Sequence, residues 1–533
     1  MSGVDPPEMP PAADEPRVLT YGLWTNKGGV GKTTLTFHLS SLYAHLHPEQ
    51  RVVLLDMCPQ ANLSHTVLNS TLRRGSAVAA ELQAGGGPAE LSRTVAGYLH
   101  SVLAHPAYSR DEIIESGFLT RLGDEGVNHR MPTNMWLLCG DPALDDMNSK
   151  LHQQLYAPQY QGVAGGPAAA RRDGFYNLLH TMRTFFKNLS REPEWRDQQI
   201  VVFVDTNPAF TEYTQLALCT IDKLIVPVNA DDFSLQAVDL MFSRVWNLFE
   251  SEGMFAEYRR GNFAPQAYQR CPDLLPKLAV VVHNRHNVYN TRATSGFQFL
   301  HQEQGWRVYQ AFVAAFARTG QDERAPPVFV DKGLPNPNQF PTLYTATVRE
   351  MFSAGVAAAY TGVPLHKVLI CRAYIEGAFN GSKIIQREPV KKLLLDLLKV
   401  LSLATDDPSL QRVNAERLCS VAGVGHVGIL VGPLGMNETE AAYDAARQAA
   451  VEAQGANAAA VAAAAAAAEA ALGQVAQPES DYYQDALSQD GLSDMHGPPS
   501  DDEDDAGPSN GAEPADAAGP SNGQRMQRTH SRN

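Results

Sequence analysis

Closely spaced cysteines are missing from this chain. Six cysteines are scattered over its 533 residues, at positions 58, 139, 219, 271, 371 and 419. No two of them are near enough in the sequence to suggest a CxxC site or the disulfide framework of a small secreted protein. A reducing compartment fits this distribution of cysteine.

Long hydrophobic runs are missing as well. No stretch of about 18 apolar residues occurs, so we expect no membrane span. Residues 1–16 (MSGVDPPEMPPAADEP) are acidic and rich in proline. They have neither the apolar core of a signal peptide nor the arginines of a transit peptide. We expect a disordered leader over these residues and a cytoplasmic protein, with the nucleus as the alternative.

The chain has no excess of basic residues. It holds 58 acidic and 43 basic side chains, for a formal net charge of −15. Residues 477–533 contain 12 of the acidic and three of the basic ones, so they carry −9 and leave −6 for the rest. The net charge of the remainder alone does not exclude a nucleic-acid partner. The composition of residues 477–533 predicts a disordered acidic tail.

Apolar runs alternate with segments of helical spacing along most of the chain. Such continuous runs are typical of the buried strands of a parallel sheet. We therefore predict an α/β fold with a doubly wound, mostly parallel sheet. The predicted strands are residues 17–24 (RVLTYGLW), 51–57 (RVVLLDM), 199–205 (QIVVFVD), 222–229 (DKLIVPVN) and 277–284 (KLAVVVHN).

The same pattern gives a domain plan. We expect one α/β domain over residues 17–404, with a long insertion at about 69–134. Residues 405–476 form an alanine-rich extension, which is predicted to be helical because alanine has the highest helix propensity. The acidic tail of residues 477–533 completes the chain.

The loop after the first run carries a phosphate-binding motif. A P-loop has the pattern GxxxxGK[ST] between a strand and a helix. Gly31, Lys32 and Thr33 match its end, while Asn26 stands where the first glycine belongs. Backbone N–H groups of such a loop cradle phosphate oxygens at the helix N-terminus. Lys32 is expected to reach the β- and γ-phosphates, and Thr33 to offer its hydroxyl to Mg²⁺.

Residues 27–34 (KGGVGKTT) resemble the deviant Walker A motif, KGGxGK[ST], of the ParA/MinD/Soj ATPases. In that family the first lysine crosses a dimer interface to the partner's phosphates, and two subunits enclose two ATP molecules. The resemblance therefore implies that Lys27 acts in trans, as an arginine finger does in phosphoryl transfer. It also implies ATP and Mg²⁺ as cofactors and an ATP-dependent homodimer.

Further stretches look like motifs of the same family. Residues 52–64 (VVLLDMCPQANLS) look like its second motif, residues 201–241 like its Walker B strand with the following unit, and residues 135–144 (MWLLCGDPAL) like a short strand between them. Asn284 falls where the family reads adenine. The candidate nucleotide-binding residues are Lys27, Gly28, Gly29, Val30, Gly31, Lys32, Thr33, Thr34 and Asn284.

Oxygen ligands for Mg²⁺ are expected where two predicted strands end. Asp205 is the Walker B candidate, and Asp56 closes the second predicted strand. Carboxyl ends of strands are where doubly wound sheets bind ligands. We predict a metal site of Thr33, Asp56 and Asp205, with Asp56 and Lys27 as catalytic residues. The alternative for Asp205 is a strand-end aspartate that caps the next turn.

One position departs from the family pattern. The second motif usually supplies two aspartates, of which the second orients the attacking water; here Asp56 matches the first and Cys58 the second. A thiol is a weak hydrogen-bonding group and is uncharged at neutral pH unless it is activated. We therefore expect ATP binding with slow or absent hydrolysis. The alternative is that another acid, with Asp231 and Asp232 as candidates, takes the role.

Basic residues gather late in the expected domain. Residues 366–399 hold seven lysines and arginines against three acidic residues, a net of +4. The Lys367–Lys399 region is a candidate for nonspecific DNA contact, with a solvated helix face as the alternative. Residues 390–403 (VKKLLLDLLKVLSL) resemble the membrane-binding helix of MinD-like relatives, but their apolar residues are too contiguous for a surface face. We expect a core helix.

Three functional hypotheses follow from the resemblance. The first is a positioning or partitioning ATPase that dimerises with ATP and acts on an unidentified protein partner or cargo. The second is an ATP-locked scaffold or adaptor that does not hydrolyse, which Cys58 favours. The third, an amidoligase-type enzyme or a nitrogenase-like iron protein, is disfavoured by Lys27 and by the scattered cysteines.

Overall fold

The structure is a computed structural model that describes only part of the chain. The described residues are 18–68, 72–85, 91–104, 114–124, 127–156, 174–249, 262–286, 288–289, 292–293, 295–368, 371–375, 387–415, 418 and 427–431. The predicted leader, the alanine-rich residues 441–473 and the acidic tail lie outside them.

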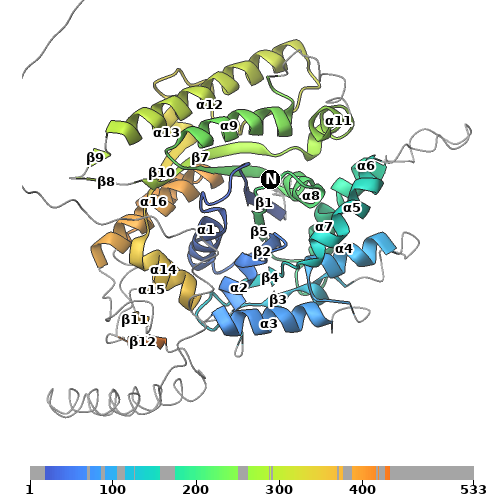
Figure 1. Cartoon of the computed structure of the whole chain (residues 1–533), viewed down its shortest axis with the longest axis vertical. Coiled ribbons are helices and arrows are strands. Elements are labelled where there is room, and N and C mark those ends of the chain that lie inside the picture. Colours follow the sequence, from blue (N-terminus) through green and yellow to red (C-terminus); the bar gives the residue numbers. More distant parts are fainter. Residues whose placement is uncertain are drawn as a thin grey trace, which may run out of the picture. The chain divides into compact units, whose positions relative to one another are not determined.

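An eight-stranded sheet organises these residues, in the order β10-β7-β6-β1-β5-β2-β4-β3 (Figure 1). All neighbouring pairs are parallel except β3 and β4. The predicted α/β fold with a doubly wound, mostly parallel sheet is confirmed. The strands are β1 (Val18–Leu23), β2 (Arg51–Met57), β3 (Thr120–Arg121), β4 (Met135–Leu138), β5 (Ile200–Thr206), β6 (Lys223–Val228), β7 (Lys277–His286) and β10 (Thr345–Arg349).

The five predicted strands correspond to β1, β2, β5, β6 and β7, each within two residues of the expected bounds. They are readable in the sequence because both faces of these strands are covered, so apolar residues follow one another without alternation. Two small sheets are separate: β8 (Val288–Tyr289) pairs with β9 (Arg292–Ala293), and β11 (Cys371–Ile375) pairs with β12 (Val427–Val431).

Helices cover both faces of the large sheet and enclose two apolar cores (Figure 1). One face carries α1 (Lys32–Leu46), α2 (Asn62–Leu68), α3 (Leu72–Ala84), α14 (Phe352–Thr361), α15 (Leu365–Val368), α16 (Arg387–Thr405) and the 3₁₀ turn η5 (Pro408–Arg412). The other carries α4 (Val95–Ala104), α5 (Ala143–Tyr156), α6 (Gly174–Leu179), α7 (Thr181–Leu189), α8 (Glu212–Thr220), α9 (Asp232–Trp246), α11 (Phe263–Arg270), α12 (Ser295–Gln321), α13 (Phe340–Tyr344) and the 3₁₀ turns η3 (Glu115–Phe118) and η4 (Pro272–Leu274).

Helix α16 settles one alternative left open by the sequence. Its residues Val390, Leu393, Leu394, Leu397, Leu398, Val400, Leu401 and Ala404 are all buried in the core. The expectation of a core helix is therefore confirmed. Among the described residues, we find no helix whose length and apolar character would let it cross a membrane.

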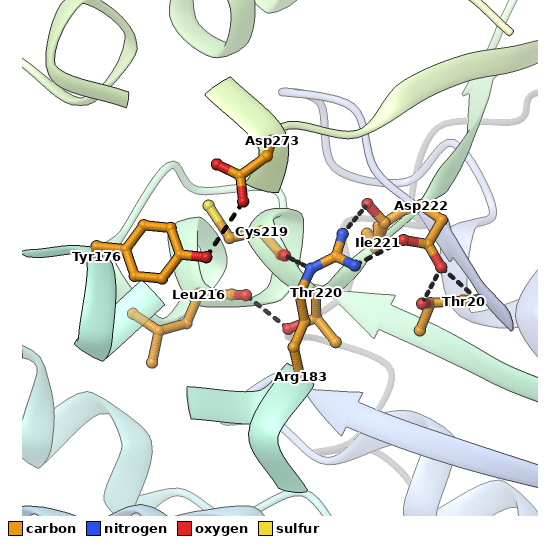
Figure 2. A network of polar contacts seen from close by, with 9 residues as sticks. All are labelled: Thr20, Tyr176, Arg183, Leu216, Cys219, Thr220, Ile221, Asp222 and Asp273. Carbon is orange, nitrogen blue, oxygen red and sulfur yellow. Dashed lines mark hydrogen bonds and ion pairs between the residues drawn. The ribbon is translucent and has the colours of Figure 1, made fainter. Parts of the chain in front are cut away.

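A polar network connects elements at the amino-terminal ends of the strands, which we call the amino edge of the sheet (Figure 2). Arg183 on α7 donates to the carbonyl oxygens of Cys219 at 2.6 Å and Ile221 at 3.2 Å, and to Asp222 Oδ1 at 2.7 Å. Asp222 Oδ2 accepts from Thr20 N at 3.0 Å and Thr20 Oγ1 at 2.6 Å. A single guanidinium thus satisfies carbonyls at the end of α8 and, through Asp222, ties β6 to β1.

Candidate nucleotide-binding site

The glycine loop between β1 and α1 has the geometry of a phosphate loop. Gly31 is the N-cap of α1 and lies in the left-handed region, with φ 85°. A Cβ placed on Gly31 would lie 2.3 Å from Asn284 Nδ2, so both the backbone angle and the space require glycine. Asn284 donates to the carbonyl oxygen of Val30 at 2.8 Å. The structure thus brings Asn284 to the loop; its contact with adenine stays a prediction.

Lys32 folds back over its own loop. Its Nζ donates to the carbonyl oxygen of Lys27 at 2.7 Å, and the residue is only 6% exposed. Burial lowers the pKa of Lys32 to about 8, although the nearby carboxylate of Asp205 opposes that shift. A cation held in this loop with a single carbonyl acceptor is ready to exchange that acceptor for phosphate oxygens.

The predicted aspartates meet at the carboxyl edge of the sheet. Asp56 on β2 lies opposite Asp205 on β5 in the strand register. Thr33 Oγ1 donates to Asp205 Oδ2 at 2.7 Å, so the first turn of α1 is joined to β5. Asp56 accepts from Cys58 N at 3.1 Å, and from Ser64 N at 3.0 Å and Ser64 Oγ at 2.7 Å.

Both carboxylates are completely buried, and burial raises the pKa of each; the charge of Asp56 raises that of Asp205 further. A bound divalent cation would offset this repulsion, and Thr33 and Asp205 present the oxygen donors that Mg²⁺ prefers. Among the described residues, no group of three or more His, Cys, Asp and Glu could hold a metal by itself. The residues therefore fit a Mg²⁺ ion completed by phosphate oxygens and water.

Cys58 lies at the end of β2, buried and 6% exposed. Burial raises the pKa of its thiol to about 12, and the charges of Asp56 and Asp205 act in the same direction. The thiol is therefore neutral at physiological pH and cannot polarise water as a carboxylate does.

The side chain of Lys27 turns to the start of helix α9. Its ammonium donates to both carboxylate oxygens of Asp231 and, at 3.2 Å, to Ser234 Oγ. Asp231 is the N-cap of α9 and also accepts from Ser234 N at 2.8 Å. Burial alone would raise the pKa of Asp231, but its hydrogen bonds to Lys27 and Ser234 lower it, so the pair is ionic. Asp231 therefore serves as an intramolecular partner for Lys27.

Sequence reasoning missed two neighbours of the site and named a third, Asp231, only as a candidate acid. Ser64 on α2 binds Asp56, Asp231 binds Lys27, and Arg244 on α9 donates to Asn26 Oδ1 at 3.0 Å. The Asp231-x-x-Ser234 spacing is a helix N-cap signal that could have placed Asp231 at the start of α9. No comparable local signal marks Ser64 or Arg244, because their partners lie on other elements.

The candidate DNA-binding region is only partly described. Lys367 donates to the carbonyl oxygen of Arg130 at 2.8 Å, and burial lowers its pKa, so it is turned into the fold. Lys392 and Lys399 are exposed on α16. The side chains of Arg372, Lys383 and Arg387 lie outside the description.

Comparison with known protein families matches residues 23–315 to the CobQ/CobB/MinD/ParA nucleotide binding domain. The chain belongs to this family. The expected relation to ParA/MinD-type P-loop ATPases is confirmed, and the glycine loop, Asp56 and Asp205 all lie within the matched residues.

Three solved structures that are similar to this chain have low sequence identity to it. Apo McdA of Cyanothece is 13% identical, covering 73% of this chain and 98% of its own, with a TM-score of 0.40. A cobyrinic acid a,c-diamide synthase of Mycobacterium smegmatis, with a bound ATP analog and magnesium, is 17% identical, covering 59% and 100%, with a TM-score of 0.31. A plasmid partition protein of Borrelia burgdorferi is 16% identical, covering 53% and 86%, with a TM-score of 0.30. A search among curated proteins finds no match.

Proposed function

We propose that the chain binds ATP with Mg²⁺, forms an ATP-sandwich homodimer and acts as a ParA/MinD-like positioning or partitioning ATPase. The observation that carries the proposal is the division of labour between two lysines on one glycine loop. Lys32 lies over the loop, whereas the ammonium of Lys27 reaches outward to Asp231 and keeps 21% of its side chain exposed. A second subunit's phosphates could recruit Lys27 from that position.

Each site residue has a defined task in this proposal. The loop N–H groups and Lys32 would bind the phosphates of ATP, and Asn284 would hold the loop in shape through Val30. Thr33, Asp56 and Asp205 would hold Mg²⁺, which supplies positive charge to the phosphates when it is bound. Asp56 would fix Ser64 and the start of α2 beside this centre.

Sedimentation of the purified protein with and without Mg·ATP tests the dimer. We expect a monomer without nucleotide and a dimer with it. Lys27→Ala should keep ATP binding and weaken the dimer, whereas Lys32→Ala should weaken ATP binding itself by roughly a hundredfold, because it removes a charge-assisted contact to phosphate. A wild type that binds ATP yet stays monomeric would remove the sandwich.

Cys58 favours a second candidate, an ATP-locked scaffold or adaptor. Its neutral thiol stands where the family usually places the aspartate that orients water. In the scaffold hypothesis the wild type releases no phosphate, whereas a slow ATPase releases it slowly; in both, the dimer persists for long. Cys58→Asp should then speed hydrolysis at least about tenfold, since water-positioning groups matter by orders of magnitude in phosphoryl transfer.

A phosphate-release assay on both forms decides between these candidates. Cys58→Ser is the matched control, because it changes the side chain without adding a carboxylate. Brisk turnover by the wild type would mean that another residue orients the water. A folded, ATP-binding Cys58→Asp variant that stays inert would place the block elsewhere, for instance in a required partner.

The surface on which such a dimer would act is a separate part of the proposal. Lys392 and Lys399 are exposed on α16, and they could contribute nonspecific phosphate contacts to DNA. Loss of DNA binding in a Lys392→Gln, Lys399→Gln double variant, with the ATP-dependent dimer intact, would support this role. The cytoplasm stays the predicted location.

A further inference from the structure

A cavity lined by arginines lies at the amino-terminal ends of the strands, opposite the ends that carry the glycine loop. It has a volume of about 600 Å³ and lies where β2 and β4 begin, beside β3 and the turn before β5. Arg51, Arg93 and Arg121 line it together with Trp136 and Trp195. Nothing in the proposed ATPase uses this cavity.

The three guanidinium groups are held in place by the protein. Arg51 lies over two neighbouring indoles, with its Cζ 5.0 Å from the ring centroid of Trp136 and 4.5 Å from that of Trp195. The Cζ of Arg121 lies 5.6 Å from the Trp136 ring, and its Nε donates to the carbonyl oxygen of Thr133 at 3.0 Å. Stacking and main-chain contacts thus orient these forks before any ligand arrives.

Arg93 supplies an N–H group that lacks a protein acceptor. Its terminal nitrogen donates to the carbonyl oxygen of Leu119 at 2.8 Å. Its Nε is buried and has no hydrogen-bond partner among the described residues. A buried guanidinium N–H without an acceptor is costly, so Arg93, which lines the cavity, keeps unmet hydrogen-bonding capacity beside it.

The charges around the cavity are not balanced. Three arginines face two carboxylates, those of Asp124 and Glu194. Asp124 is 3.7 Å from Arg121 Nε, and both side chains are about half exposed, so this ion pair is weak. Burial lowers the pKa of Arg51, whereas the charge of Glu194 raises it. The charge of Arg121 lowers the pKa of Arg51 as well, because the two arginines repel each other.

We propose that this cavity binds the phosphate group of a small phosphorylated molecule. Guanidinium forks recognise phosphate oxygens in pairs, and three of them converge here. The volume lies in the usual range of small-molecule sites. Arg51 already occupies indole faces of Trp136 and Trp195, which leaves a poor stacking platform for the bases of a single-stranded nucleic acid.

The test must first remove phosphate binding by the glycine loop, which is also expected to bind phosphates. In full-length Lys32→Ala protein, calorimetric titration with inorganic pyrophosphate should show binding. Adding Arg121→Gln or Arg93→Gln should weaken that binding at least about tenfold. Arg196→Gln is the matched control, because Arg196 is exposed and does not line the cavity.

A variant that is expected to tighten binding excludes loss of fold as the cause of the effects. Glu194→Gln removes a competing negative charge without cutting the cavity, so it should tighten pyrophosphate binding severalfold. No binding to Lys32→Ala at millimolar pyrophosphate, or equal binding by the Arg121→Gln and Arg196→Gln versions, would overturn the proposal. So would single-stranded DNA binding at this cavity in preference to pyrophosphate.

Two further probes separate the sources of the phosphate group. Glycerol 3-phosphate that binds as well as inorganic phosphate supports a phosphate monoester as the ligand. Binding of the inorganic ions alone overturns the small-molecule part of the proposal, as it indicates an adventitious ion only. Failure of the proposed ATPase would leave this test intact, because its readout is the difference between Arg121→Gln and Arg196→Gln.

Discussion

The two edges of the sheet gather opposite charges. At the carboxyl edge, Asp56 and Asp205 are buried side by side, and each has a raised pKa. At the amino edge, Arg51, Arg93 and Arg121 surround a cavity. The same strand β2 begins with Arg51 and reaches Asp56 one residue before its end. The carboxyl edge therefore holds two buried carboxylates, and the cavity at the amino edge has three arginines against the carboxylates of Asp124 and Glu194.

The difference indicates which kind of ligand would fit each edge. Burial raises the pKa of both carboxyls, and the charge of Asp56 raises that of Asp205 further, so a cation such as Mg²⁺ beside the Thr33 hydroxyl would be favoured. The arginines are instead oriented without a ligand, because Arg51 and Arg121 lie over indole rings and Arg93 and Arg121 donate to main-chain carbonyls. The carboxyl edge is thus expected to respond to pH and metal, and the amino edge to anions.

The largest expected effect separates stability from ligand binding. Arg183→Ala should lower the free energy of unfolding by about 2 kcal/mol, because two carbonyls and Asp222 lose a charged donor at once. Denaturant unfolding measures the change. ATP affinity should stay within about twofold, since the network lies at the amino edge. Lys187→Ala, on the exposed side of the same helix, is the control; a similar loss there would argue against a special role for Arg183.

A second effect concerns pH at the carboxyl edge. Mg²⁺ binding needs Asp205 ionised, whereas the metal-free protein holds its proton to a higher pH than usual. Binding therefore releases a proton, strengthens as pH rises, and should weaken up to about tenfold per unit as pH falls through the raised pKa. Titration of Mg·ATP at pH 8 and pH 6 measures this. ATP itself titrates in this range, so the decisive quantity is the excess slope over Asp205→Asn; equal slopes would contradict the assignment.

The smallest effect concerns the intramolecular partner of Lys27. Asp231→Asn keeps a helix N-cap but removes the charge that holds Lys27. A partly exposed ion pair contributes about 1 kcal/mol or less, so ATP-dependent dimerisation should strengthen up to about fivefold. Sedimentation equilibrium measures it. Asp232→Asn changes the exposed neighbour and should have no effect; a dimer weakened by Asp231→Asn would mean that Asp231 supports the interface instead.

Much of the fold could be predicted because local signals agreed. The β1–loop–α1 unit combines an apolar run, a glycine loop and helical spacing, and the structure has all three at the expected residues. Strand β10 and the small strand β3 were not predicted. β3 has two residues and β10 alternates between buried and half-buried positions, so neither has the long apolar run that marks a central strand.

The residues of the site could be predicted, but their partners could not. Motif matching named Lys27, Lys32, Thr33, Asp56, Asp205 and Asn284, and the structure brings all six to the glycine loop or to the strand ends beside it. Their roles in binding and catalysis stay predictions. The partners of these residues were not predictable, because Ser64 and Arg244 belong to helices whose position depends on packing.

The sequence alone determined the strand–loop–helix unit, the pair of lysines and the replacement of an aspartate by Cys58, since these are local patterns. Tertiary structure decided which distant residues meet. Lys27 and Asp231 are 204 residues apart and meet because β1 lies next to β6 in the sheet. Arg51 and Trp195 meet because β2 lies next to β5. The spacing of residues along the chain does not show which strands are neighbours. Strand order follows from how the apolar faces of strands and helices cover one another.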